Sequence, residues 1–213
     1  MNFEYFLESI PKIKNIPLPA ETSQFKMSPP FRLELVKRHK EQMIYAKRAG
    51  VMALFYPDEQ LKTRIALILR KTYKGVHSAQ IGFPGGKIEP EDPDLETAAI
   101  RETYEEVGVH NSQIEVIKEL TQVYIPVSNF YVQPFIGISR GTPNFIKQDD
   151  EVEDIVEVLL EHLLDDEIVT TQYVPTTYKV EVEVPAYLLN GHVVWGATAM
   201  MLSEIKDLLK LSL

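Results

Sequence analysis

Three carboxylates in one short stretch have the spacing to hold a divalent cation. Glu102, Glu105 and Glu106 are related as i, i+3 and i+4, so they share one face of an α-helix. Like charges at this spacing repel one another, and the helix dipole disfavours anions near the C-terminal end. Mg²⁺ or Mn²⁺ would convert that repulsion into coordination, because hard cations prefer carboxylate oxygen. Taken alone, such a triplet is more typical of a solvated surface helix.

The residues around the triplet favour the metal site. Arg101 lies four residues before Glu105, so it can pair with that carboxylate and orient it. The stretch FPGGK lies upstream, and its two glycines permit a tight turn and close approach of the backbone to a ligand. An acidic, proline-containing loop, IEPEDPD, joins this turn to the helix. The combination predicts a cation site between the turn and the helix.

The same segment resembles the Nudix box, G-x5-E-x7-R-E-U-x-E-E-x-G-U, in which U is an aliphatic residue. The matching positions are Gly86, Arg101, Glu102, Glu105, Glu106, Gly108 and Val109. Three features depart from the pattern. The interval from Gly86 to Arg101 is one residue longer, Asp92 stands at the first glutamate, and Thr103 stands at the first aliphatic position. These departures leave open whether Asp92 or Asp94 serves as the loop acid.

The upstream segment ALILRKTYKGVHSAQIGFPGG is similar to the one that marks coenzyme A pyrophosphatases within the Nudix family. The matches are Leu67, Arg70, His77, Gln80 and residues 83–86. Gly75 and Ala79 stand where arginine and glycine are common. The resemblance implies an α+β fold, an α/β/α sandwich with a mixed sheet, and Mg²⁺ or Mn²⁺ as cofactor. It further implies hydrolysis of the diphosphate bond of coenzyme A or its derivatives, giving 3′,5′-ADP and 4′-phosphopantetheine products.

The resemblance also implies roles for individual residues. Glu102 and Glu106 are expected metal ligands, and Glu105 is a third ligand or a base that orients water. The Gly86 carbonyl is expected to face the metal, and Arg101 to orient Glu105. Substrate binding is expected from Arg70, His77 and Gln80. An alternative base is Glu151 or Glu153, although an acidic loop such as QDDEVED is more often simply solvated.

Elements that could position these groups follow from hydrophobic patterning. We predict strands over 49–57 and 64–71, and a helix over 95–107 that Gly108 ends. The remaining predicted elements are strands within 114–127 and 130–140, a strand and short helix in 155–166, a hairpin over 172–189, and a closing helix within 192–211. We predict that residues 1–48 form an arm, partly helical within 32–48, packed on a Nudix domain of residues 49–213.

Composition limits the possible partners. The chain has 213 residues, a net charge of −9 and no cysteine, which excludes thiol catalysis and disulfides and argues against general nucleic-acid binding. No apolar run is long enough to span a membrane, and the N-terminus does not resemble a signal peptide. We therefore expect a cytoplasmic protein with a small-molecule diphosphate substrate, no nucleic-acid or membrane partner, and a possible homodimer.

Two alternatives and two minor interpretations remain open. The chain could hydrolyse another nucleoside diphosphate derivative such as ADP-ribose, or it could be a non-catalytic binding module, although retention of three mutually repelling acids argues against the latter. A basic stretch that includes Arg32 and Arg38 could meet the 3′-phosphate of coenzyme A, but a solvated helix face is more usual. Trp195 is expected in the core.

Overall fold

A mixed β-sheet forms the centre of the protein in this computed structural model, which describes residues 1–72, 79–175 and 181–213. Its strands are β1 (Lys47–Pro57), β2 (Thr63–Arg70), β3 (Ile81–Gly82), β4 (Gly85–Lys87), β5 (Glu115–Glu119), β6 (Val123–Ile125), β7 (Phe130–Ile138) and β8 (Val152–Leu159). The order is β3-β2-β1-β7-β5, while β4, β6 and β8 pair with β1, β7 and β2. β1 pairs in parallel with β7 and antiparallel with β2, which confirms the predicted mixed sheet.

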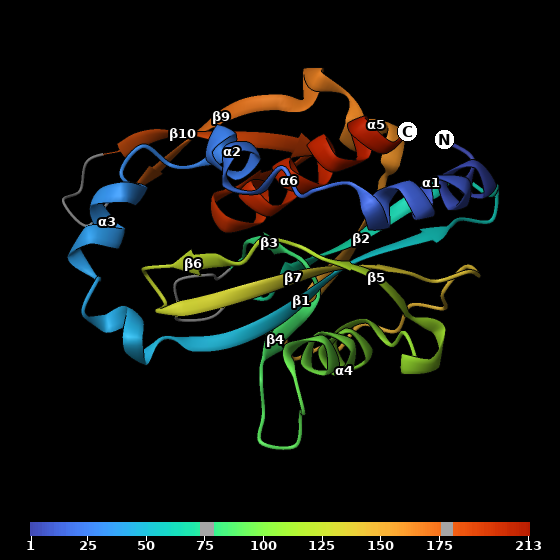
Figure 1. Ribbon diagram of the computed structural model, residues 1–213, viewed down its shortest axis with the longest axis horizontal. Helices are drawn as coiled ribbons and strands as arrows, with labels where there is room; N and C mark the ends of the chain where they lie inside the picture. The colour runs from blue at the N-terminus through green and yellow to red at the C-terminus, as the bar shows by residue number, and fades with distance from the viewer. Residues whose placement is uncertain (73–78, 176–180) are drawn as a thin grey trace.

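Helices cover both faces of this sheet (Figure 1). Helix α4 (Leu95–Val107) lies on one face, and α1 (Phe3–Asn15) and α6 (Gly196–Ser212) lie on the other. Alternate residues of β1 serve the two faces. Leu54 and Tyr56 pack in the cluster under α4, whereas Ala53 and Phe55 pack in the cluster under α1 and α6. Because both faces are buried, the strand appears in the sequence as a continuous apolar run. The predicted α/β/α sandwich is confirmed.

The chain before β1 contributes to the core. Phe3, Phe6, Ile10 and Ile13 recur at helical spacing and are buried. Short helices follow: α2 (Ala20–Gln24), η1 (Phe25–Met27), α3 (Arg32–Arg38) and η2 (Gln42–Tyr45). The helix predicted within 32–48 is thus confined to its first part. The predicted division after residue 48 stays a prediction, although β1 begins two residues earlier than expected, at Lys47.

The helix that carries the acidic triplet has the predicted bounds. The Asp94 side chain caps its N-terminus by accepting a hydrogen bond of 2.8 Å from the Thr97 backbone N–H. Gly108 ends it with φ of 77°, the left-handed conformation that glycine adopts without a Cβ clash. Both ends are therefore fixed by local chemistry that the sequence displays.

The C-terminal region corrects one prediction. A small sheet orders as β11-β10-β9, with bounds β9 (Val169–Pro175), β10 (Glu181–Leu189) and β11 (His192–Trp195). The predicted hairpin is present, but residues 192–195 form a strand rather than the start of the closing helix, because they pair with β10 and Gly196 follows with φ of 65°. The other short elements are η3 (Asn111–Gln113), α5 (Leu160–Leu164) and η4 (Asp166–Ile168).

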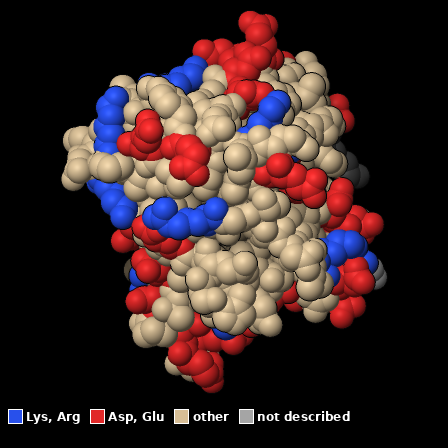
Figure 2. Space-filling view, turned by 90° about the vertical axis from the view of Figure 1, so that its right-hand side faces the viewer, with Lys and Arg blue, Asp and Glu red and all other residues tan. Residues whose placement is uncertain are grey.

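Two surface properties bear on the expected partners. Among the described residues, every helix is too short or too polar to cross a membrane. On the one face shown in Figure 2, acidic and basic side chains are interspersed, and no continuous basic surface covers the residues drawn there. The absence of a nucleic-acid partner stays a prediction, as does cytoplasmic localisation.

Candidate active site

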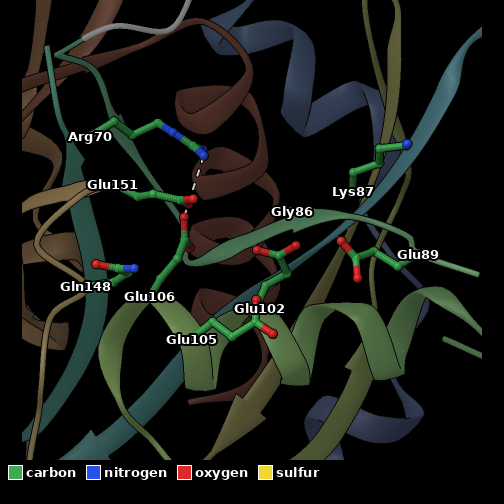
Figure 3. A pocket seen from close by; sticks show the side chains of 9 residues that line it. All are labelled: Arg70, Gly86, Lys87, Glu89, Glu102, Glu105, Glu106, Gln148 and Glu151. Carbon is green, nitrogen blue, oxygen red and sulfur yellow. Dashed lines mark ion pairs between the residues drawn. The ribbon is translucent and has the colours of Figure 1, made fainter. Parts of the chain in front are cut away.

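An acidic cavity of about 510 Å³ lies beside α4 (Figure 3). Its lining comes from the end of β2, from β4 and the loop after it, from α4, and from the turn before β8: Arg70, Gly86, Lys87, Glu89, Glu102, Glu105, Glu106, Gln148 and Glu151. Five carboxylates thus face two cationic side chains, which gives the cavity an excess of three negative charges when all are ionised. Such a concentration of hard oxygen donors attracts a divalent cation.

Glu106 lies in the least solvated part of the cavity. Its side chain is 2% exposed, its Oε2 accepts a hydrogen bond of 2.7 Å from the Gly85 backbone N–H, and its Oε1 lies 3.5 Å from Arg70 Nη2. Burial raises the pKa of this carboxyl to about 7, while Arg70 and the Gly85 N–H act in the opposite direction. The folded chain therefore holds a carboxylate whose charge has too few compensating partners.

Glu102 faces the backbone of β4. Burial also raises the pKa of its carboxyl, and the neighbouring Arg101 guanidinium opposes that rise. A Cβ added at Gly86 would lie only 2.3–2.5 Å from the Glu102 carboxylate atoms. Glycine at this position therefore lets the carboxylate sit directly against the strand, where the cavity begins.

Gly86→Ala is expected to displace Glu102 while leaving the fold intact, because the clashing atoms are the end of a flexible side chain. We expect a 10–100-fold loss of Mg²⁺ affinity, on the order seen when groups that orient metal ligands are removed. Calorimetric Mg²⁺ titration measures this, with thermal unfolding as the check on folding. The control is Gly82→Ala, whose added Cβ would meet no atom within 4 Å. Unchanged affinity in Gly86→Ala would contradict the assignment of Glu102.

Arg101 lies behind the cavity and connects its acids. Its guanidinium donates to Glu105 at 3.0 Å and to Glu102 at 3.1 Å, and it binds Asp92 through two nitrogens at 2.9 and 3.1 Å. It also donates to the Lys87 carbonyl at 3.1 Å. The expected pairing with Glu105 is present, and the additional contact with Glu102 lets Arg101 position two of the three acids of this helix face.

Asp92 and Asp94, the two loop acids that the sequence left open as metal ligands, do not line the acidic cavity. Asp92 is engaged by Arg101, whose hydrogen bonds hold the pKa of that carboxyl below its usual range, and Asp94 caps α4. The loop acid that lines the cavity is Glu89. Glu89 was not among the predicted site residues, although it follows Lys87 by two residues, and period-two alternation from β4 would place both side chains on one side.

The donor chemistry of the cavity fits Mg²⁺ or Mn²⁺. Carboxylates of Glu102, Glu105 and Glu106 supply hard oxygens on one helix face, next to the backbone at Gly86. Within the described ranges, however, no three acidic or histidine side chains already converge on one point. Glu105 is turned toward Arg101 and Glu106 toward Gly85, so rotation about side-chain torsions would have to bring them together.

The predicted substrate-binding residues lie in different places. Arg70 lines the acidic cavity, whereas Gln80 lines a second, larger cavity of about 840 Å³, and His77 lies outside the described residues. Trp195 also lines the second cavity and is only partly buried, so its expected place in the core is wrong. The two cavities share three lining residues, Arg70, Gly86 and Lys87, and are therefore adjacent.

The family is established by comparison with known proteins. The NUDIX domain model matches residues 46–177, so the chain belongs to the Nudix family. It is 29% identical over 158 residues to the peroxisomal coenzyme A diphosphatase ndx-8 of Caenorhabditis elegans, covering 72% of this chain and 64% of that protein. It is also 29% identical over 147 residues to NudL, an uncharacterised Nudix hydrolase of Yersinia pestis, covering 68% of this chain and 69% of that one.

A solved structure agrees with the fold. A MutT/nudix family protein from Enterococcus faecalis superposes with a TM-score of 0.50 at 17% identity, covering 78% of this chain and 62% of that chain. At this identity the likeness concerns the fold alone. The chain spans 64% of the length of its coenzyme A diphosphatase relative.

Proposed function

We propose that this protein hydrolyses the diphosphate bond of coenzyme A or its derivatives with Mg²⁺ or Mn²⁺, yielding 3′,5′-ADP and 4′-phosphopantetheine products. The observation that carries the proposal is the adjacency of the two cavities. An acidic cavity suits a metal-bound diphosphate, and an apolar cavity beside it suits one organic half of the substrate. Similarity to a coenzyme A diphosphatase supports this choice of substrate.

In the proposed reaction Glu102 and Glu106 hold the metal, with Glu105 as a third ligand or as a base that orients water. When bound, the metal neutralises charge on the diphosphate and lowers the pKa of water. Arg70 and Lys87 contact phosphate oxygens at the junction of the cavities. Water adds to one phosphorus, the bridging P–O bond breaks, and its electron pair leaves with the other phosphate. A carboxylate must take the proton that the water releases.

Glu151 is the better placed of the two loop acids for this proton. It lines the acidic cavity and lies beside Arg70 and Glu106 in Figure 3. Glu153 does not line that cavity, and its carboxylate lies 4.0 Å from Lys71 Nζ. The place of Glu151 in the cavity lining supports its choice over Glu153 as the base.

Glu151→Gln is expected to lower kcat by about 100-fold, within the range for loss of a general base, with KM little changed. Glu153→Gln, two residues away, is the matched control and is expected to retain the parental rate. Steady-state kinetics with Mg²⁺ on both variants decides the assignment. A parental rate in both variants would show that Glu151 is not the base and would leave Glu105 as the candidate for that role.

A substrate panel tests the function itself. Coenzyme A and ADP-ribose are incubated separately with the protein and Mg²⁺ or Mn²⁺, and the products are resolved by mass. We expect coenzyme A to be split and ADP-ribose to react at least tenfold more slowly. Cleavage of ADP-ribose with survival of coenzyme A would establish the alternative substrate class. Survival of every diphosphate would instead favour a binding module.

Ala79, one of the two departures from the coenzyme A pyrophosphatase segment, is weak evidence for an alternative substrate. Ala79 has φ of 54°, in the left-handed region that favours glycine, which is the residue common there. The backbone at this position therefore suits the subgroup's usual residue. The other departure, Gly75, lies outside the described residues.

A further inference from the structure

The second cavity is built partly by chain that precedes the family domain. Its volume of about 840 Å³ lies within the range of roughly 300–1,000 Å³ typical of small-molecule sites. Phe83, Phe130 and Trp195 contribute apolar wall from the region after residue 46. Phe31 and Arg32, at the start of α3, contribute wall from the N-terminal segment, which the NUDIX domain model does not cover. The N-terminal segment thus helps to determine what the cavity accepts.

Arg32 is the unusual charge in this cavity. Its side chain is partly buried, and burial lowers the pKa of the guanidinium while attraction to Glu21 opposes that effect. Its backbone N–H donates to the Pro29 carbonyl, but its guanidinium forms no hydrogen bond or ion pair with the described residues. By contrast, Arg38, at the other end of α3 and also in the wall, is paired with Glu34 of the same helix. A partly desolvated guanidinium with unused donors is a receptor for an anion.

We infer that Arg32 binds a second anionic group of the substrate, a phosphomonoester on the organic half that occupies the apolar cavity. This rests on the proposed function, in which the diphosphate lies at the junction formed by Arg70, Gly86 and Lys87. The substrate class is then a nucleoside diphosphate derivative with an additional phosphate on its nucleoside. The planar fork of arginine can donate two parallel hydrogen bonds to such a phosphate. Diphosphates whose nucleoside lacks that phosphate leave Arg32 without a partner and bind more weakly.

Trp195 provides a direct signal for occupancy of this cavity, because it lines the cavity and is the only tryptophan of the chain. Its fluorescence therefore reports binding without any need for hydrolysis or metal. The probes are adenosine 3′,5′-bisphosphate and AMP, which differ by one phosphomonoester. Their dissociation constants are measured for the parent, for Arg32→Ala, for Arg32→Lys, and for Lys37→Ala. Lys37 is exposed on the same helix and does not line the cavity, so it is the matched control.

The parent is expected to bind the bisphosphate at least about tenfold more tightly than AMP, the scale of a charge-assisted hydrogen bond. Arg32→Ala is expected to bind both probes equally, Arg32→Lys to keep part of the preference, and Lys37→Ala to keep all of it. Equal binding of the two probes by the parent, or an undiminished preference in Arg32→Ala, overturns the inference. A preference without coenzyme A hydrolysis would refute the proposed reaction alone. Hydrolysis without a preference would refute the role of Arg32 alone.

Discussion

Replacing Glu106 by glutamine is expected to lower Mg²⁺-dependent diphosphate hydrolysis by at least about 100-fold, because an amide is a far poorer ligand for a hard cation than a carboxylate. The substitution preserves shape and can still accept the hydrogen bond from the Gly85 N–H. Steady-state kinetics at saturating coenzyme A, together with Mg²⁺ titration, measures the loss. A variant with the full metal-dependent rate would remove Glu106 from the metal site.

The same substitution is expected to stabilise the metal-free protein at high pH. The pKa of Glu106 is raised to about 7 in the folded chain, so folding is favoured by the bound proton at low pH. That contribution is fully present below the unfolded pKa and is lost as the pH rises through about 7. Glutamine is neutral throughout and avoids this loss. At pH 8 we expect the free energy of unfolding of Glu106→Gln to exceed that of the parent by roughly 1–3 kcal/mol, since one pKa unit corresponds to about 1.4 kcal/mol.

Urea unfolding at pH 4 and pH 8, with and without Mg²⁺, tests this result. The difference in free energy of unfolding between Glu106→Gln and the parent should be near zero at pH 4 and largest at pH 8 without metal. It should be reduced or reversed when Mg²⁺ stabilises the parent. The matched control is Glu105→Gln, because Glu105 has a half-exposed side chain and is already paired with Arg101. A parent that is more stable than Glu106→Gln in metal-free buffer at pH 8 would refute the claim that this carboxylate is held at a cost.

Arg101→Ala is expected to destabilise the fold by about 3 kcal/mol and to abolish metal-dependent activity. Its removal leaves Asp92, whose side chain is 3% exposed, without its main partner, and breaking a buried pair on one side costs roughly 3–5 kcal/mol. We take the lower end because Arg101 is itself partly solvated, at 21% exposed. Activity is lost because Glu102 and Glu105 are no longer oriented.

The control for this prediction is Arg140→Ala, which breaks an exposed pair with Glu115 and should cost less than about 1 kcal/mol. Acid provides a second check. The pKa of Asp92 is held low by the Arg101 hydrogen bonds, so the stability from this pair is present above the ordinary aspartate pKa and is lost as the pH falls through the lowered value. The difference in free energy of unfolding between the parent and Arg101→Ala should therefore become smaller in acid. A gap that is constant from pH 7 to pH 2 would contradict the pairing.

The features that sequence analysis predicted well are encoded locally. The bounds of α4 follow from an aspartate cap, a helical period and a terminal glycine, all within adjacent residues. The continuous apolar run of β1 likewise marks a strand covered on both faces. Because helix spacing is fixed, the sequence alone predicts that Glu102, Glu105 and Glu106 share one face.

The features that sequence analysis missed depend on tertiary contacts. Trp195 resembles a core residue by type, yet the small sheet places it at a cavity wall. The sequence allowed a phosphate contact for the basic stretch that includes Arg32 but favoured a solvated helix face, and only the place of Arg32 in the wall of the second cavity favours the contact. Asp92 stands where the family pattern has its first glutamate, but its engagement with Arg101 is a contact of the folded loop. Patterns of residue type carry no information about such neighbours.

The most direct test of metal-dependent diphosphate hydrolysis is to incubate the protein with coenzyme A and Mg²⁺ in ¹⁸O-labelled water and to analyse the products by mass spectrometry. We predict 3′,5′-ADP and 4′-phosphopantetheine in equal amounts, with a single ¹⁸O in one of the two newly exposed phosphates and no reaction in EDTA. Intact coenzyme A in the presence of metal, or release of free inorganic phosphate in place of these two products, would contradict the proposed reaction.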